Sequence, residues 1–441
     1  MRVPLAAGGV PTAMVLLQIA WVLVRSGVVT SVGLPIAAEG VVLALFAGAL
    51  VAAMPARSIE RLDRGLEALA RDAWGAAALT VAAALAIGVG GALVQQVPSW
   101  DERFMMPAVR LAADEGLSTF FEKYASLEWL GRQHPPLPVL VYAAIRRVTG
   151  CDLLGLRLAT VLLGAASLLA ALSVARRLVR PGTALLSVLL LLASPLFVRI
   201  ESAAMNDLFV TAFFLAALDL VFRISRAPST SGAILLGLCV GCGLVSKYTM
   251  TIASPVLAVA ALHEGTLWSR RREWAIGVAV AAAITGAWVF LGLRIGVFGG
   301  QAEWFDEMAR TSTGSSHGFH NALEAIFTKL PSGLGVYLMP ILAGGVAAFA
   351  RSGGASARLL AAWVALVSLP LLVTLPDNRY FLPAYPALSI VAARGAEPLG
   401  AERVRVLVLG WLLCAAALAF YAQVDLGDRA LLFSTLFGHR R

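Results

Sequence analysis

The sequence contains little charge and few residues that form crosslinks or metal sites. Only 14% of its 441 residues are charged, and it has 4 cysteines and 5 histidines. Soluble domains carry about 25% charged residues, which keep the folded surface dispersed in water. The shortage of cysteine argues against a disulfide scaffold. Cys239 and Cys242 form a CxxC inside an apolar segment without a second ligand pair nearby, which favours core cysteines over structural zinc.

Hydrophobic residues make up 59% of the chain, and the mean hydropathy is +0.82. The apolar segments recur at lengths near the ~20 residues that cross about 30 Å of hydrocarbon. We therefore predict an all-α polytopic membrane protein with a bundle of about 11–13 helices. The expected spans are 3–24, 33–54, 74–94, 155–177, 183–200, 206–224, 231–246, 248–264, 274–296, 332–350, 358–375, 379–396 and 402–423.

The formal net charge of +9 does not indicate nucleic-acid binding, because no long basic tract or basic face exists. Arginines instead cluster at the ends of apolar segments, as at 176–180 and 270–272. Cytoplasmic loops show this positive-inside bias. The opposite side then receives two long connections, about 95–154 and 297–331, with interfacial helices expected in the first.

The chain divides into three regions. Residues 1–73 contain an extra transmembrane pair and an amphipathic cytoplasmic connector, 74–396 a transmembrane catalytic core, and 397–441 the last span with a short tail. No internal repeat relates the two halves, although secondary transporters commonly contain one. Polar residues gather on one outer face, which favours chemistry at a membrane surface.

The first outer connection begins with the adjacent acids Asp101 and Glu102. Carboxylates beside a bilayer can act as a general base, an acceptor contact or a metal ligand, or remain solvated at a helix end. His134 precedes two prolines, which indicates a rigid turn, and a lone histidine is also a common structural hydrogen-bonder.

Further ionisable residues lie at the edges of later spans. Such residues usually face a cavity, because exposing them to lipid costs several kcal/mol. Asp207 could equally cap its own helix, and Lys247 could extend to the interface or contact a phosphate. The candidate residues at these edges are Arg199, Asn206, Asp207, Lys247, Arg379 and Tyr380.

Taken in order, these motifs resemble the C-type glycosyltransferases that use polyprenyl-phosphate sugars, the group of protein O-mannosyltransferases and lipid A aminoarabinose transferases. The resemblance covers roughly residues 74 to 396. Its motifs are Asp101-Glu102, His134-Pro135-Pro136-Leu137, Arg157-Leu158 leading to Ala175-Arg176-Arg177-Leu178, Asn206-Asp207, Gly243 to Lys247, and Arg379-Tyr380-Phe381-Leu382-Pro383.

The resemblance implies a role for each matching position. Asp101 would be the catalytic base, Glu102 an acceptor or metal contact, and Asp207 the second outer acid. His134, Lys247, Arg379 and Tyr380 would bind the donor phosphate, although the aminoarabinose branch commonly has lysine where this chain has His134. Asn206, Arg157 and Arg199 would complete the cavity. A divalent cation, Mg²⁺ or Mn²⁺, at Asp101 and Glu102 is left open, because the sequence reveals no complete ligand set.

The implied activity is transfer of a sugar, with inversion, from a polyprenyl phosphate to an acceptor hydroxyl on a lipid, glycan or protein. The composition indicates a bacterial inner membrane, with the active site facing the periplasm or cell exterior. The alternatives are a transporter or flippase of a lipid-linked sugar, which would need no base, and a structural subunit of an envelope complex.

Overall fold

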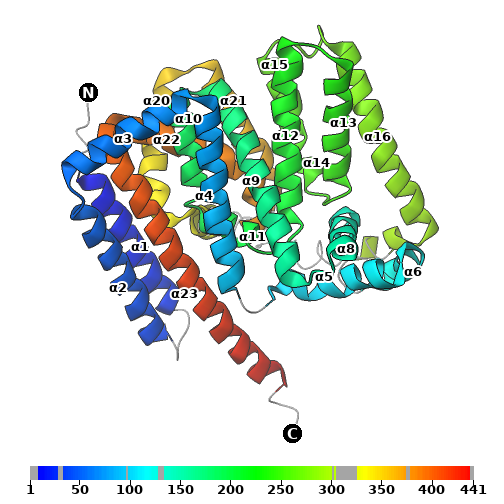
Figure 1. Cartoon of the computed structure of the whole chain (residues 1–441), viewed down its shortest axis with the longest axis horizontal. Coiled ribbons are helices and arrows are strands. Elements are labelled where there is room, and N and C mark those ends of the chain that lie inside the picture. Colours follow the sequence, from blue (N-terminus) through cyan, green and yellow to red (C-terminus); the bar gives the residue numbers. More distant parts are fainter. Residues whose placement is uncertain are drawn as a thin grey trace.

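The computed structural model describes residues 8–27, 33–95, 98–127, 134–299, 302–303, 325–373 and 378–437. Every regular element in these ranges is helical, which confirms the predicted fold class (Figure 1). Five helical segments are long and apolar enough to cross a membrane, or up to eight if each of three bent pairs counts as one span. The bundle contains α4 (Ala73–Val94), α9 (Leu153–Leu178), α12 (Asp207–Arg226), α16 (Arg271–Arg294), α21 (Ala355–Val373) and α23 (Arg403–Phe437).

Further helical elements complete the bundle. They are α1 (Gly9–Gly27), α2 (Gly33–Ala52), α13 (Thr230–Leu244), α14 (Met250–Ala253), α15 (Pro255–His263), η3 (Ala325–Lys329), α19 (Leu330–Leu334), η4 (Val336–Leu338), α20 (Met339–Ser352), η5 (Asn378–Ala384), α22 (Tyr385–Ala396) and η6 (Glu397–Glu402). The last helix continues to Phe437, well beyond the end expected near 423. Much of the second long outer connection lies outside the described residues.

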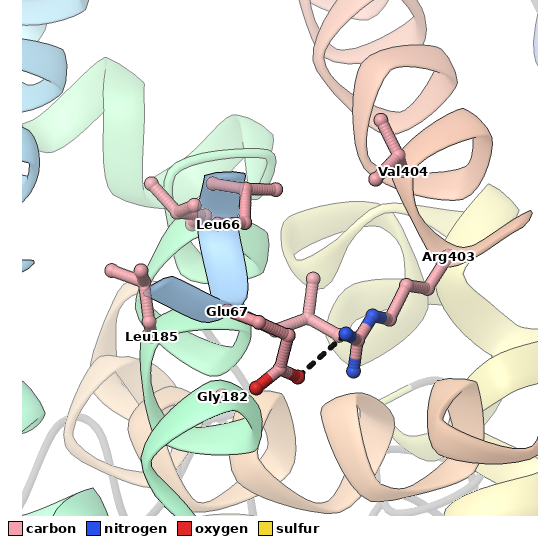
Figure 2. A pocket seen from close by; sticks show the side chains of 8 residues that line it. Leu66, Glu67, Gly182, Leu185, Arg403 and Val404 are labelled. Carbon is pink, nitrogen blue, oxygen red and sulfur yellow. Dashed lines mark hydrogen bonds and ion pairs between the residues drawn. The ribbon is translucent and has the colours of Figure 1, made fainter. Parts of the chain in front are cut away.

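The N-terminal helices α1 and α2 pack beside α23 at one side of the bundle (Figure 1). After α2 the chain bends by 88° into α3 (Ala56–Arg71), the amphipathic connector expected from the sequence. Two acids fasten α3 to the start of α23, since Asp63 and Glu67 accept from Arg403 at 2.6 and 2.5 Å. Figure 2 shows the second contact, with Leu66 and Leu185 beside it.

The segment expected as one span at 183–200 is bent by 70° between α10 (Pro181–Leu191) and α11 (Pro195–Glu201). Pro195 lacks a backbone donor and begins the second helix, so the first helix ends before it. The hydroxyl of Ser194 at the bend donates to the carbonyls of Gly333 and Leu334, each at 3.1 Å. The bend brings the chain after α11 to the outer layer.

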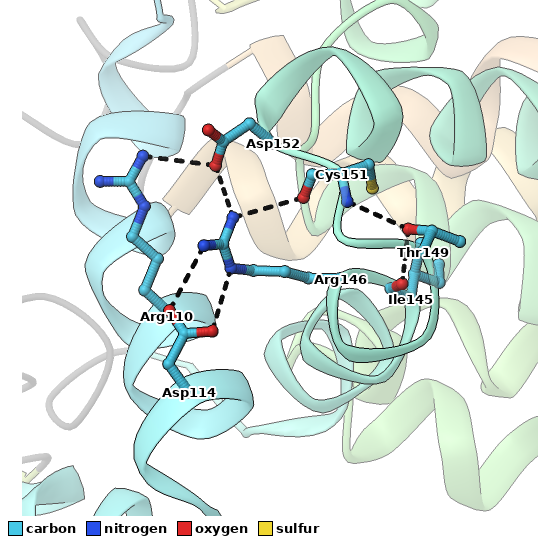
Figure 3. Close-up of polar contacts among 7 residues, drawn as sticks. All are labelled: Arg110, Asp114, Ile145, Arg146, Thr149, Cys151 and Asp152. Atoms are coloured by element: carbon cyan, nitrogen blue, oxygen red, sulfur yellow. Dashed lines mark hydrogen bonds and ion pairs between the residues drawn. The ribbon is translucent and has the colours of Figure 1, made fainter.

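That outer layer contains α5 (Trp100–Arg110), η1 (Leu111–Glu115), α6 (Leu117–Lys123), η2 (Tyr124–Ser126) and α8 (Leu137–Thr149). These elements gather at the end of the bundle where α4 ends and α9 begins (Figure 1). Arg146 of α8 joins them, because it donates to Asp114 at 3.3 Å and to Asp152 at 2.5 Å (Figure 3). The layer shares an apolar core with Phe209 and Trp288 of the spanning helices.

Helices α20 and α22 approach each other through glycine. A Cβ placed on Gly345 would lie 1.8 Å from the carbonyl oxygen of Val391, and one on Gly395 would lie 1.9 Å from that of Ile341. Small residues allow such close packing, which contributes much of the association energy of helices in lipid. The backbone contact therefore depends on the absence of both side chains.

We predict that Gly345→Ala destabilises the protein by about 1–3 kcal/mol, because the added methyl overpacks the contact with α22. Thermal unfolding of the purified protein in detergent measures the change. The neighbouring Gly344→Ala is a matched control, since its Cβ would meet Gly395 at an ordinary 3.6 Å. Equal unfolding temperatures for both variants would contradict this account of the packing.

Candidate functional site

The first turn of α5 places two acids at the outer end of the bundle. Ser99 caps this helix, and its backbone N–H donates in return to Glu102 at 2.6 Å, forming a capping box. Asp101 and Glu102 are only 4% and 0% exposed. Buried acids at a membrane interface usually face a partner or a cavity.

Glu102 is held by four N–H groups. Arg157 of α9 donates to its two oxygens, from Nε and Nη2, at 2.8 Å each. The backbone N–H groups of Ser99 and Ala204 provide the other two bonds, at 2.6 and 2.8 Å. Burial would raise the pKa of Glu102, but these hydrogen bonds and the charge of Arg157 outweigh it and lower the pKa. The carboxylate thus joins α5, α9 and the chain after α11.

Asp101 has a different partner on a distant element. Arg379, near the start of η5, donates to its Oδ2. Tyr380 follows on the same short helix, and its ring lies 4.6 Å from the Nζ of Lys247. The contact places a cation against an aromatic face, a favourable arrangement in a desolvated site.

Lys247 lies between α13 and α14 and is 4% exposed. Its Nζ donates to Oδ1 of Asp207, the first residue of α12, at 2.6 Å. Burial would lower the pKa of Lys247, but the negative charge of Asp207 and the Tyr380 hydroxyl raise it overall. Lys247 is therefore charged at neutral pH.

His134, just before α8, is 5% exposed. Burial lowers the pKa of His134 well below its ordinary value, and the positive charges of Lys247 and Arg379 lower it further. The imidazole is thus neutral at physiological pH, and it faces the same cations. Its carbonyl accepts from the hydroxyl of Tyr124 at 2.5 Å, which ties the turn to η2.

The structure thus brings six of the sequence-predicted residues into one constellation, drawn from five elements: Asp101, His134, Asp207, Lys247, Arg379 and Tyr380. Asn206 lies beside them in sequence and is 2% exposed. Both amide atoms of Asn206 and Oδ2 of Asp207 are buried without a hydrogen-bond partner among the described residues. Buried polar atoms of this kind usually meet water or a ligand.

Two further predicted residues lie on α9 and α11. Arg157 serves Glu102 and also donates to the carbonyl of Gln95 at the end of α4. Arg199 is half-buried on α11. Sequence reasoning missed Ser99 and Ala204, whose N–H groups complete the bonding of Glu102. The pattern Ser-x-x-Glu at 99–102 is a recognisable capping signature and could have revealed the first of them.

A Mg²⁺ or Mn²⁺ ion at Asp101 and Glu102, which the sequence left open, does not fit this geometry. Glu102 already accepts four hydrogen bonds, and Asp101 is paired with Arg379. No group of three or more His, Cys, Asp or Glu side chains in the described part of the chain could hold an ion. The residues therefore do not fit a divalent site, and we derive no step through one.

Two solved membrane proteins share this fold. The chain superposes on ArnT from Cupriavidus metallidurans bound to undecaprenyl phosphate, with a TM-score of 0.51 and 18% identity. The match covers 73% of this chain and 60% of ArnT. The Archaeoglobus fulgidus oligosaccharyltransferase gives a TM-score of 0.51 at 12% identity, over 77% of this chain and 53% of that protein.

Sequence comparison gives a more particular likeness. Residues 133–290 match the family model of dolichyl-phosphate-mannose-protein mannosyltransferase. The lipopolysaccharide core galacturonosyltransferase RgtA of Rhizobium johnstonii is 31% identical over 180 residues, which are 40% of this chain and 35% of RgtA. The chain thus spans only part of the relatives that it matches. These findings confirm the resemblance predicted from the motifs.

We predict that Glu102→Gln destabilises the fold by about 3–5 kcal/mol, because it leaves Arg157 buried without its charged partner. Thermal unfolding in detergent checks the change, with the exposed Glu122→Gln as the control in the same layer. A loss of activity with unchanged unfolding would instead indicate the direct acceptor or metal contact first expected for Glu102.

His134 should make stability dependent on pH. Because its pKa is lower in the folded than in the unfolded chain, its stabilising effect is present above about pH 6.5 and is lost as the pH falls below that value. We therefore expect the unfolding temperature to fall between about pH 7.5 and pH 5.5. His134→Gln should flatten this dependence. Parallel curves for wild type and His134→Gln would contradict the assignment.

Proposed function

We propose that the protein is a membrane glycosyltransferase that moves a sugar from a polyprenyl-phosphate donor to an acceptor hydroxyl. The observation that carries this proposal is the juxtaposition of Asp101 with the cations Arg379 and Lys247 in one buried site. The family match at residues 133–290 and the ArnT-like fold support it. The arginine bias of the opposite loops supports an extracytoplasmic site in a bacterial inner membrane.

In the proposed reaction, Asp101 accepts the proton of the acceptor hydroxyl as its oxygen attacks the anomeric carbon of the sugar. The bond from that carbon to the phosphate oxygen breaks, and the lipid phosphate leaves as an anion. One displacement inverts the anomeric configuration. A general base of this kind contributes about 10²–10⁴ in rate.

The two cations would stabilise the departing phosphate. Arg379 offers a planar fork to phosphate oxygens, while Lys247 supplies a compact charge. In the structure each is neutralised by a carboxylate, Arg379 by Asp101 and Lys247 by Asp207. A phosphate that draws Arg379 toward itself weakens its hold on Asp101 and leaves that carboxylate more basic. Donor binding would thus prepare the base.

The remaining groups would position these residues and the sugar. The unpartnered amide of Asn206 and Oδ2 of Asp207 are suited to hydroxyl groups of the sugar. Neutral His134 can donate one hydrogen bond to a phosphate oxygen without adding charge. Glu102, saturated by N–H donors, acts in this proposal as a positioning residue that fixes the first turn of α5.

We predict that Asp101→Asn lowers turnover about 10²–10⁴-fold while donor binding persists. Release of sugar from polyprenyl-phosphate donors by the purified protein in lipid measures this, with transfer to water or a simple alcohol as the readout. The matched control is Asp114→Asn, an exposed acid of the same outer layer, which should retain wild-type turnover.

A folded Asp101→Asn protein with full activity would refute the role of Asp101. Wild-type protein that binds the lipid but turns over none of the donors would favour transport of a lipid-linked sugar instead. Comparison of the anomeric configuration of donor and product tests inversion separately.

A further inference from the structure

A second charged cavity lies at the opposite end of the bundle from the candidate active site. It measures about 740 Å³ and is lined by Arg177 in the last turn of α9, by Arg180 just after this helix and by Arg394 of α22. Glu397 accepts from Arg180 at 2.7 Å and from Arg394. Cavities of this size accommodate small-molecule ligands.

Positive charge exceeds negative charge around this cavity. Arg177 has Asp219 of α12 at 3.5 Å, but that acid already accepts from Arg223 at 2.6 Å and from the Ser173 hydroxyl. The two carboxylates, of Asp219 and Glu397, therefore pair with four arginines in all, which are Arg177, Arg180, Arg223 and Arg394. Nε of Arg177 is buried without a hydrogen-bond partner among the described residues. The surplus donors are suited to an anion.

An apolar groove adjoins the charged cavity. It measures about 550 Å³, lies between α20 and α21, and is lined by side chains such as Val346, Val364 and Leu388. Phe349 lines both the groove and the cavity, so the two are adjacent. Arg358 adds another cation to the lining of the groove.

The packing of α20 explains why the groove is open. Gly345 and Gly395 hold α20 against α22 at backbone contact. Helix α21 packs mainly on α15 and η5 instead, and it makes few contacts with α20. The apolar flanks of α20 and α21 therefore face each other across unfilled space.

We propose that an anionic phospholipid of this membrane leaflet binds here, with its phosphate against Arg177 and Arg394 and an acyl chain in the groove. Guanidinium groups bind phosphate oxygens in pairs, and basic pockets between membrane helices recognise lipid headgroups. The acyl chain of a phospholipid would occupy the apolar groove, whereas a free phosphate ion would leave it empty. The site is separate from the constellation around Asp101, so the proposal does not rest on sugar transfer.

The test compares how much phosphatidylglycerol and how much phosphatidylcholine, with the same acyl chains, the protein retains. Native mass spectrometry of the whole chain measures both. Wild type should retain phosphatidylglycerol about tenfold better, equivalent to about 1.4 kcal/mol. The double variant Arg177→Gln/Arg394→Gln should lose this preference. It should fold, because Asp219 keeps Arg223 and Ser173, and Glu397 keeps Arg180 and Thr183.

Two controls isolate the site. Arg351→Gln removes an exposed arginine at the end of α20 that is near the charged cavity, and this variant should retain the preference for phosphatidylglycerol. Ala361→Trp, which fills the groove, should reduce retention of both lipids, while Val278→Trp on the exposed face of α16 should not. Equal retention of the two lipids by wild type would overturn the proposal. So would a loss of preference in Arg351→Gln, or displacement of phosphatidylglycerol by undecaprenyl phosphate that depends on the same two arginines.

Discussion

The buried ion pair between Glu102 and Arg157 is the interaction on which the outer part of the structure depends. It is almost completely withdrawn from water, and it joins the start of α5, the start of α9 and the chain after the bent α11. A buried carboxylate is tolerated only when its charge and lone pairs are satisfied, so all three segments must come together. Asp101 is adjacent to Glu102 and Asp207 follows Ala204 closely, so the same pair sets the position of both acids of the candidate site.

Beyond this fixed pair, the site consists of groups that can exchange partners. Arg379 and Lys247 are each held by one carboxylate, and both lie near neutral His134. A rigid, saturated acid beside two exchangeable pairs is a reasonable arrangement for a reaction that separates charge. The rigid part keeps the helix end in place, while the exchangeable part responds to an incoming phosphate.

The sequence was a sufficient basis for the helical class, the connector α3 and the location of the polar residues. The length of the hydrophobic segments reports directly on the bilayer, which explains the agreement in helical class. It was not sufficient to predict which side chains form ion pairs with each other. Asp101 and Arg379 are far apart in the chain, and only the packed bundle reveals that they pair. Periodicity also missed the bend before Pro195, because Ser194 is satisfied there by carbonyls of a distant helix. From the sequence we predicted that Glu102 contacts the acceptor or a metal ion, although Ser99, three residues earlier, already indicated a helix cap that involves Glu102.

Helix α9 carries an arginine near each end, Arg157, the partner of Glu102, at one end and Arg177 of the proposed lipid site at the other. An α-helix rises ~1.5 Å per residue, so these two side chains are separated by about 30 Å along the axis. This separation equals the hydrocarbon thickness of an ordinary bilayer. The spacing of these two arginines on α9 therefore matches the protein to a membrane of one thickness. In a thinner or thicker bilayer it must tilt or distort the lipid around it, and the two polar layers would then no longer lie together at their respective interfaces.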